Sequence, residues 1–453
     1  MNNKDFLKKN SKSIVIYNPL SNIGHFDSWC SLFVKNLLEN GWALIVITRN
    51  AAKVLSDLDH AHITDKSKLL VIDQGTDLRM DGKFSVLEII INKIKILKFL
   101  AFIKLNDRRS NQSFFNILVS FSARVFNYLI RKLELCLSKF IPGKLRISFN
   151  NPVEFAADIN LLTKAFGGSP SFVLNMYLDL YDPSPKLWEK FSDNMHCKWG
   201  GIHMDLSRAL TDRPYSHSKS LKAIYTINEP VEFYDKTTQA KNLFQWLPDV
   251  TDISVPSNPS PVRQDIEKLA AGRKIIFLGG SIGGTKNLYL WSKLFYKLNR
   301  REWYFVQIGK IEYPTLSRED LDGLHKLQNE KTENIFISDA YLPEESVFNE
   351  VMSISAIIWG LYRGFDRSSN ILTKSALLSK PIIVSDRFLM GQRVNTYKIG
   401  VAVSEIDADD AKLGIEWLIN NPIPLANFER YADVYSTSAL AKKLNESLLQ
   451  IIS

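Results

Sequence analysis

The sequence has few cysteines, no metal-ligating spacing of His, Cys, Asp or Glu, and no long uninterrupted apolar run. Its three cysteines, Cys30, Cys136 and Cys197, are scattered over 453 residues, with the spacing of neither a metal site nor a redox pair. These absences predict a chain in a reducing compartment that needs neither a disulfide nor a metal ion. The polar residues 1–12 lead directly into an apolar run, so we expect no signal peptide and a cytoplasmic location.

The positive charge is concentrated in one segment. The formal net charge is +9, and residues 83–146 alone hold 13 Lys and Arg against three acidic residues. Lys93, Lys95 and Lys98 break the longest apolar stretch, so no run approaches the roughly 20 residues of a membrane-spanning helix. Helices with an apolar face rimmed by Lys and Arg lie in the membrane interface. The segment therefore predicts a basic amphipathic helical insertion that binds anionic lipid on the inner face of the cell membrane. A buried helical hairpin with solvated lysines is the alternative. Nucleic acid is not an expected partner, because no nucleic-acid-reading module accompanies the charge.

The order of strand-like and helix-like runs predicts two α/β domains. The chain is too long for one ordinary hydrophobic core. Apolar strand-like runs alternate with helix-length stretches on both sides of a Pro- and Ser-rich linker at residues 254–261. The expected strands cover residues 13–17, 43–48, 69–73, 171–177, 198–203 and 222–227 before the linker, and 274–279, 303–309, 334–338, 355–359 and 381–385 after it. We therefore expect two Rossmann-like domains, residues 1–255 and 262–435, followed by an amphipathic terminal helix at residues 436–453.

Two loops of the second domain have the composition of anion-binding sites. The sequence GGSIGGTKN (residues 279–287) follows the first strand; its glycines let backbone amides approach a phosphate, and Lys286 adds a positive charge. The other loop begins the stretch at residues 364–386, has Arg363, Arg367 and Lys374 in or beside it, and ends in residues that favour a helix start. Open α/β sheets bind ligands at this edge, so the loops predict a diphosphate site. A tight turn beside a solvated basic face is the alternative. An NAD-type site is disfavoured because no acidic residue ends the second strand at residues 306–309.

These residues resemble glycosyltransferases of the GT-B class, most of all the retaining family 4 type. Residues 279–287 stand where that class has a Gly-Arg and Lys-Gly/Asn loop after the first strand of its C-terminal domain. The run YLPEESVFNEVMSISAIIWGLYRGFDRSSNILTKSALLSKPIIVSD (residues 341–386) is similar to the family's Y-x-P-x-E, E-A and G-K-P-V-I pattern. At the other end, GHFDSWCSLFVKNLLENGWALIVITRN (residues 24–50) is similar to the N-terminal glycine loop and helix. WLPDVTD at residues 246–252 fits the inter-domain crossing.

The resemblance implies a site for a nucleotide-diphosphate sugar, with some changes. The family's loop lysine is kept as Lys286, but its loop arginine falls on Ser281 and its two glutamates fall on Arg363 and Lys374. Those glutamates usually contact the donor sugar or ribose, so recognition of the donor hydroxyls is expected to be altered. The resemblance also implies that a helix dipole and basic side chains, rather than a metal, neutralise the diphosphate, and that the last helix packs back on the N-terminal domain. The expected donor-binding residues are Gly280, Ser281, Gly284, Lys286, Arg363, Ser368, Ser369, Asn370 and Lys374.

Acceptor-side groups are expected where strands of the first domain end. His25 lies in the loop after the first strand, and Asp179 and His203 follow two later strands at the same predicted edge. Each of these three expected catalytic residues could orient an acceptor hydroxyl. Loop capping is the alternative role for each.

The sequence thus predicts a glycosyltransferase that moves a sugar from a nucleotide-diphosphate donor to a membrane-associated glycan or lipid-linked acceptor in cell-surface polysaccharide synthesis. The nucleotide sugar is a co-substrate, and no other cofactor is expected. One alternative is a catalytically inactive GT-B relative that acts as a binding or scaffold subunit, which the lost glutamates favour. The other is a sugar-nucleotide epimerase of the same fold, which needs clustered acids in the cleft.

Overall fold

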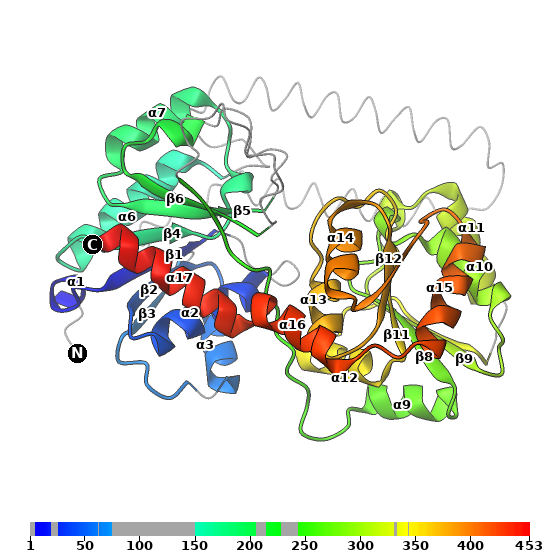
Figure 1. Ribbon diagram of the computed structural model, residues 1–453. Coiled ribbons are helices and arrows are strands. Elements are labelled where there is room, and N and C mark those ends of the chain that lie inside the picture. Colours follow the sequence, from blue (N-terminus) through cyan, green and yellow to red (C-terminus); the bar gives the residue numbers. More distant parts are fainter. Residues whose placement is uncertain are drawn as a thin grey trace, which may run out of the picture.

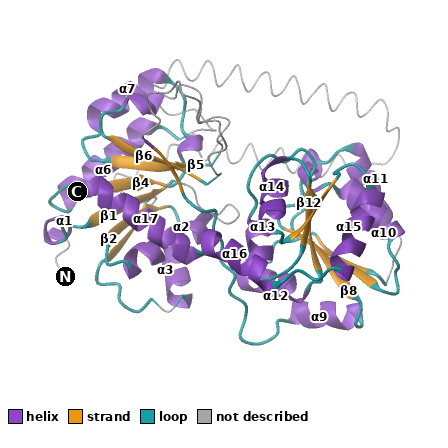
Figure 2. Cartoon of the chain, viewed as in Figure 1, coloured by secondary structure: helices purple, strands orange, loops and turns teal. Residues whose placement is uncertain are grey.

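Two α/β domains lie side by side in the computed structural model of the chain (Figure 1). The structure describes residues 5–19, 26–61, 63–74, 150–204, 214–227, 243–329, 333–342 and 344–453. The predicted catalytic residue His25 and the predicted basic insertion at residues 83–146 lie outside the described residues. Figure 2 shows a layer of strands between helices in each domain.

The first domain is built on a parallel seven-stranded sheet with the order β3-β2-β1-β4-β5-β6-β7. Its strands are β1 (Ser13–Asn18), β2 (Ala43–Thr48), β3 (Leu69–Asp73), β4 (Phe172–Asn175), β5 (Trp199–His203), β6 (Leu221–Thr226) and β7 (Phe244–Trp246). Every residue of β1 and β2 is buried, as expected for strands covered by helices on both faces. The first six strands coincide with the predicted runs to within two residues at each end, whereas β7 is not among the predicted strands.

Alternate side chains of β1 enter two separate cores. Ile14 and Ile16 pack with α2, α3 and the terminal helix α17 on one face, and Val15 and Tyr17 pack with α6 and α7 on the other. The bounds of these elements and of the short helices near them are α1 (Phe6–Lys9), α2 (Phe26–Glu39), α3 (Ala51–His60), α6 (Pro152–Ala165), η2 (Leu178–Leu180), α7 (Pro185–Asn194), η3 (Pro214–His217) and α17 (Thr437–Ile452).

The second domain has a parallel six-stranded sheet with the order β10-β9-β8-β11-β12-β13. Its strands are β8 (Lys274–Gly279), β9 (Trp303–Ile308), β10 (Ile335–Ser338), β11 (Ile357–Gly360), β12 (Ile382–Ser385) and β13 (Gly400–Val403). The first five confirm the predicted strands, and β13 is an additional, half-buried edge strand. Both sheets have the strand order of the Rossmann fold, which confirms the predicted fold class.

Helices cover both faces of the second sheet. One face packs against α9 (Pro261–Ala270), α12 (Glu345–Ile354), α13 (Asn370–Leu377), α14 (Phe388–Tyr397) and α16 (Leu425–Tyr435). The other face packs against α10 (Leu288–Lys297), α11 (Arg318–Asn329) and α15 (Ala408–Asn420), while η5 (Gly284–Lys286) and η6 (Tyr313–Thr315) lie in the loops at the strand ends.

The terminal helix returns to the first domain. The chain leaves α16 at Ser436, whose side chain accepts a hydrogen bond from the first turn of α17. Leu440, Leu444 and Leu448 are fully buried in the core that contains α2, and Trp42 Nε1 donates to Asn445 Oδ1 at 2.9 Å. Figure 1 shows α17 lying beside α2. This packing confirms the prediction for the terminal helix.

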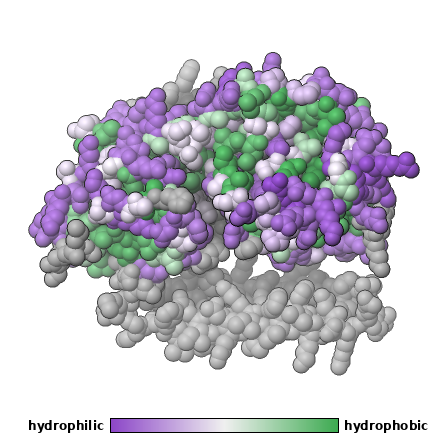
Figure 3. Space-filling view, turned by 90° about the horizontal axis from the view of Figure 1, so that it is seen from below, coloured by the Kyte–Doolittle hydropathy of each residue, from purple (hydrophilic) through white to green (hydrophobic). Residues whose placement is uncertain are grey.

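Within the described ranges, no helix is both long enough and apolar enough to cross a membrane. Figure 3 shows that hydrophobic residues of the second domain gather towards the middle of the molecule, while hydrophilic residues occupy its outer edge.

Candidate active site

The two predicted anion-binding loops meet at one point of the second sheet. The loop after β8 and the loop after β11 leave neighbouring strands, and the strand order reverses between these two strands. Such a switch point is where open α/β sheets bind ligands. The backbone N–H of Arg363 donates to the Thr285 carbonyl at 2.8 Å, so the loops are joined to each other.

The glycine-rich loop (residues 279–287) is hydrogen-bonded to the end of β9 and to the loop that follows it. The N–H of Gly280 donates to the Ile308 carbonyl at 3.1 Å, and the N–H of Gly284 donates to Thr315 Oγ1 at 3.1 Å. Ser281 Oγ donates to the carboxylate of Glu312. These groups are therefore hydrogen-bonded within the fold, and the contact of Gly280, Ser281 and Gly284 with the donor stays a prediction.

Glycine is required in this loop by close packing. Gly280 has a φ of +93°, a conformation that L side chains rarely adopt. A Cβ atom added to Gly309, in the neighbouring loop, would lie 1.7 Å from the Gly280 carbonyl oxygen, and one added to Gly284 would lie 2.4 Å from the Thr315 carbonyl oxygen. The glycines thus let the two loops lie against each other.

Lys286 holds a buried positive charge at the switch point. Its Nζ donates to the Gly279 carbonyl at 3.1 Å and to the Tyr362 hydroxyl at 2.5 Å, and it lies 4.1 Å from the centre of the Tyr362 ring. The residue is 9% exposed, and no carboxylate pairs with it among the described residues. Burying an ammonium group without a counter-ion is unfavourable. An anion beside Lys286 would supply the missing charge.

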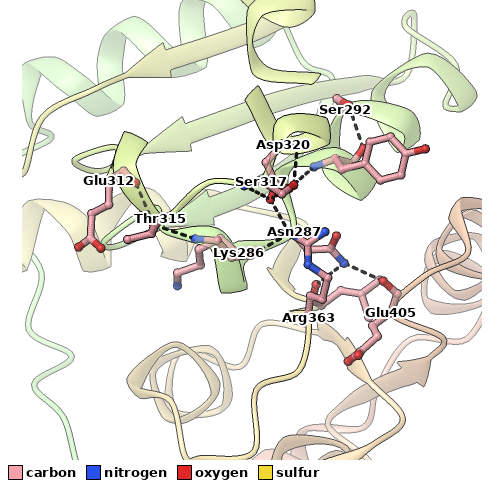
Figure 4. Close-up of polar contacts among 12 residues, drawn as sticks. Lys286, Asn287, Ser292, Glu312, Thr315, Ser317, Asp320, Arg363 and Glu405 are labelled. Atoms are coloured by element: carbon pink, nitrogen blue, oxygen red, sulfur yellow. Dashed lines mark hydrogen bonds and ion pairs between the residues drawn. The ribbon is translucent and has the colours of Figure 1, made fainter. Parts of the chain in front are cut away.

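The side chain of Arg363 connects the loop after β11 to the glycine-rich loop and to α11. Its guanidinium pairs with the carboxylate of Asp320 and donates to the Gly284 carbonyl at 3.2 Å (Figure 4). Asp320 is fully buried and also accepts from Ser317 Oγ at 2.8 Å and from the Tyr289 N–H at 2.9 Å. This side chain therefore positions the glycine-rich loop through a buried carboxylate, and a direct contact of Arg363 with the donor stays a prediction.

The start of α13 points to the same edge. Ser369 is its N-cap residue but makes no side-chain capping bond, and Asn370 is the first helical residue. The uncapped first turn retains the positive end of the helix dipole. Ser368, in contrast, donates its hydroxyl hydrogen to the carboxylate of Asp249 and accepts from Arg393 Nη1 at 2.6 Å. Its side chain is therefore hydrogen-bonded to the inter-domain crossing at residues 246–252.

The side chain of Lys374 also binds to the inter-domain crossing. Its Nζ donates to the Asp252 carbonyl and to Asn349 Oδ1, both at 2.6 Å, and it pairs with Glu345 at 2.7 Å. Burial lowers the pKa of Lys374, and the neighbouring Glu345 carboxylate partly opposes this effect. These contacts hold the side chain between α12 and the inter-domain crossing, and the binding of a diphosphate by Lys374 stays a prediction.

In the first domain the structure brings two of the three predicted catalytic residues together. Asp179 lies in η2 after β4, and His203 is the last residue of the neighbouring strand β5. The Asp179 carboxylate lies directly against His203 Nδ1 and accepts from the Met204 N–H at 2.5 Å. His203 is 1% exposed. Neither ring nitrogen of His203 has a hydrogen-bond partner among the described residues, so its contact with Asp179 is a close approach without hydrogen-bond geometry.

The sequence reasoning missed two charged residues of this region. Glu405, after β13, accepts from the Gly364 N–H at 3.1 Å and from Ser385 Oγ at 2.7 Å, and so fixes the second loop. Arg393 in α14 is 3% exposed and donates to the Ile227 carbonyl of the first domain at 3.4 Å. The signal that could have identified Arg393 is a single charged side chain within a mainly apolar helix. Within the described ranges, no group of three or more His, Cys, Asp or Glu side chains could hold a metal ion.

No protein-family model and no curated protein matches the sequence. Solved structures do match its fold. The chain is similar to a glycosyltransferase from Rickettsia africae, with a TM-score of 0.59, 13% identity, and coverage of 97% of this chain and 98% of that one. It is also similar to HepE from Anabaena in complex with UDP and glucose (TM-score 0.57, 9% identity, 97% and 100% coverage). A third is sucrose-phosphate synthase from Thermosynechococcus elongatus (TM-score 0.56, 10% identity, 97% and 99% coverage). The fold is therefore the GT-B fold predicted from the sequence.

Proposed function

We propose that the chain is a glycosyltransferase that moves a sugar from a nucleotide-diphosphate donor to a hydroxyl group of an acceptor. The observation that carries this proposal is the buried ammonium of Lys286, which lacks a carboxylate partner in the described part of the chain and lies at the switch point of the second sheet. The diphosphate would bind between Lys286 and the uncapped start of α13. The HepE structures with UDP and UDP-glucose support this class of donor.

The charges of this site suit the departure of a diphosphate. As the bond between the sugar and the phosphate breaks, negative charge develops on the leaving oxygen, and donors that are already fixed stabilise it most. Lys286 is held by two hydrogen bonds, and Arg363 fixes the loop on which it stands. The site is therefore preorganised by residues of the fold, with Ser369 and Asn370 supplying backbone amides.

The acceptor is proposed to be a membrane-associated glycan or lipid-linked intermediate of cell-surface polysaccharide synthesis. The basic segment at residues 83–146 supports this part of the proposal, because an apolar surface with many Lys and Arg residues binds anionic lipid. The enzyme would then act in the cytoplasm, peripheral on the inner face of the cell membrane. There it would meet a soluble donor and a lipid-borne acceptor together.

An inactive binding subunit is the second candidate. It is favoured by the contacts of Arg363 and Lys374, which stand at the family's glutamate positions and interact with other parts of this chain. Both candidates predict nucleotide binding, but only the enzyme releases sugar from the donor. Sugar release therefore separates them.

The donor site is tested by a thermal-shift screen with UDP-, GDP-, ADP- and dTDP-glucose. One nucleotide should raise the melting temperature, because a ligand at 100 times its Kd stabilises the folded state by about 2.7 kcal/mol. Lys286→Met should lose that shift, whereas Lys293→Met, at an exposed position of α10, should keep it. An equal shift in both variants would place the donor elsewhere, and no shift with any nucleotide would contradict the proposed function.

A further inference from the structure

We infer that Arg393 is a positioning residue that fixes the first domain relative to the donor-binding edge of the second domain. This inference rests on the proposed function and adds to it the side chain that sets the acceptor side against the donor side. Three observations carry it. Two nitrogens of one guanidinium donate to different domains, the group is buried, and one of its partners directly precedes the start of α13.

The guanidinium of Arg393 joins the two domains. Arg393 lies in α14, which Figure 1 shows on the side of the second domain that faces the first. Its Nη2 donates to the carbonyl of Ile227 at 3.4 Å, and Ile227 directly follows β6 at the carboxyl end of the first sheet. Its Nη1 donates to Ser368 Oγ of the second domain at 2.6 Å. Because the guanidinium is planar and rigid, these two bonds together set the distance between Ile227 and Ser368.

Ser368 connects Arg393 to the proposed diphosphate site. It stands directly before Ser369, the N-cap residue of α13, and the uncapped first turn of this helix is the proposed partner of the diphosphate. The Ser368 hydroxyl also donates to the carboxylate of Asp249, in the crossing that follows β7. The start of α13 is therefore held from two sides, by the crossing through Asp249 and by the first sheet through Arg393.

Burial makes this bridge specific to arginine. Arg393 is 3% exposed, and its guanidinium carbon lies 4.6 Å from the centre of the ring of Tyr435, the last residue of α16. A buried charge depends on its hydrogen bonds because little water can replace them. Lysine would keep the positive charge, but its single ammonium nitrogen lacks the planar fork that reaches two separated oxygen atoms. A lysine at this position would thus preserve the charge and lose the bridge.

The transfer depends on this bridge, whereas donor binding does not. Lys286 and the start of α13 both belong to the second domain, so a nucleotide can bind there whatever the position of the first domain. Transfer also needs an acceptor oxygen brought to the anomeric carbon from the first domain. A displacement of about 1 Å between reacting groups can lower a rate by roughly 10²-fold. Loss of the bridge should therefore lower kcat and leave the donor Kd unchanged.

The first measurement is the distance between the domains in the full chain. Spin labels are attached at Glu189→Cys in α7 and Glu416→Cys in α15, two exposed positions on different domains. Cys30 and Cys197 are buried and stay unlabelled, and Cys136 is replaced by serine. Wild type should give one narrow distance distribution, and Arg393→Lys should give a broader one. Ser368→Ala should also broaden it, because the guanidinium then loses one of the bonds that orient it.

The second measurement separates binding from turnover. It uses the nucleotide sugar found by the thermal-shift screen, with water as the acceptor. Arg393→Lys should bind this donor with the wild-type Kd and release sugar about 10²-fold more slowly. A purely structural role for the buried charge predicts the opposite result, since lysine keeps that charge.

Arg430→Lys is the matched control for both measurements. Arg430 is exposed in α16 and donates to the carbonyls of Thr396 and Tyr397 at 3.1 and 3.0 Å, within its own domain. This variant should keep the wild-type distance distribution and the wild-type rate.

Melting curves show whether Arg393→Lys is folded. A folded variant with the wild-type distance distribution, or with the wild-type kcat, overturns the inference. If this variant does not fold, Ser368→Ala decides: an unchanged distance distribution overturns the inference. Absence of nucleotide binding by wild type is a different result, because it overturns the proposed function, and the distance measurement then still decides whether Arg393 joins the domains.

Discussion

Replacing Leu444 by alanine should destabilise the first domain, although Leu444 lies at the far end of the sequence. Its side chain is fully buried in the core formed with α2 and the first sheet. Leu→Ala changes at such sites cost about 2–5 kcal/mol, from lost burial and from the cavity that remains. Since each kcal/mol shifts the melting temperature of a 150–250-residue domain by about 2–4 °C, we expect a drop of roughly 4–20 °C.

The matched control for this prediction is Leu449→Ala. Leu449 is in the same helix but is 38% exposed, so the change in helix propensity is the same and the lost burial is smaller. Both variants are compared with wild type by calorimetry, and amide hydrogen exchange in β1 and β2 reports on the first domain directly. Leu444→Ala should speed exchange there far more than Leu449→Ala. Equal effects of the two changes would refute the packing of α17 as a structural part of the first domain.

Three further predictions concern charge. Burial lowers the pKa of Lys374 below its ordinary value of 10.5, so between these two values the unfolded chain binds a proton that the folded chain has lost. The stability of wild type relative to Lys374→Met should therefore rise as pH increases through that window; a pH-independent difference in urea denaturation would contradict this. Arg363→Gln should cost about 1–3 kcal/mol, because Asp320 loses its ionic partner, and should raise the donor KM; an unchanged KM would count against the loop-positioning role. The chain should co-sediment with anionic liposomes at low salt, less at high salt, and not after residues 84–140 are replaced by a short linker; equal binding to neutral liposomes would refute the lipid-binding role.

The sheets could be predicted from the sequence because their signal is local. β1, β2 and β8 are continuous runs of apolar residues, and parallel strands buried on both faces have this pattern. β7 has three residues and β13 is half buried, so neither produces a comparable run. The terminal helix was predictable in part, since its leucines at spacings of four need a partner surface.

The roles of the charged side chains could not be predicted, because they depend on contacts between distant parts of the chain. The sequence correctly brings Arg363 to the edge of the second sheet, but its partner Asp320 lies 43 residues away, in helix α11. Lys374 similarly bonds to the Asp252 carbonyl, 122 residues away. A basic residue near a phosphate-like loop has the same local pattern whether it binds the ligand or another part of the fold. From the sequence, Asp179 and His203 could be placed at the same edge of the first sheet, but the contact between their side chains could not be predicted.

Release of free sugar from a nucleotide sugar, with wild type and Lys286→Met compared under saturating donor, tests the proposed enzyme most directly. We expect the wild-type chain to release sugar and nucleoside diphosphate in equal amounts from one of the four nucleotide-glucose donors. Lys286→Met should react about 10²–10³-fold more slowly, the usual effect of removing one preorganised donor to a developing negative charge. Lys293→Met should match wild type. No release from any donor, or equal rates for Lys286→Met and wild type, would contradict a glycosyltransferase whose leaving group is stabilised at Lys286.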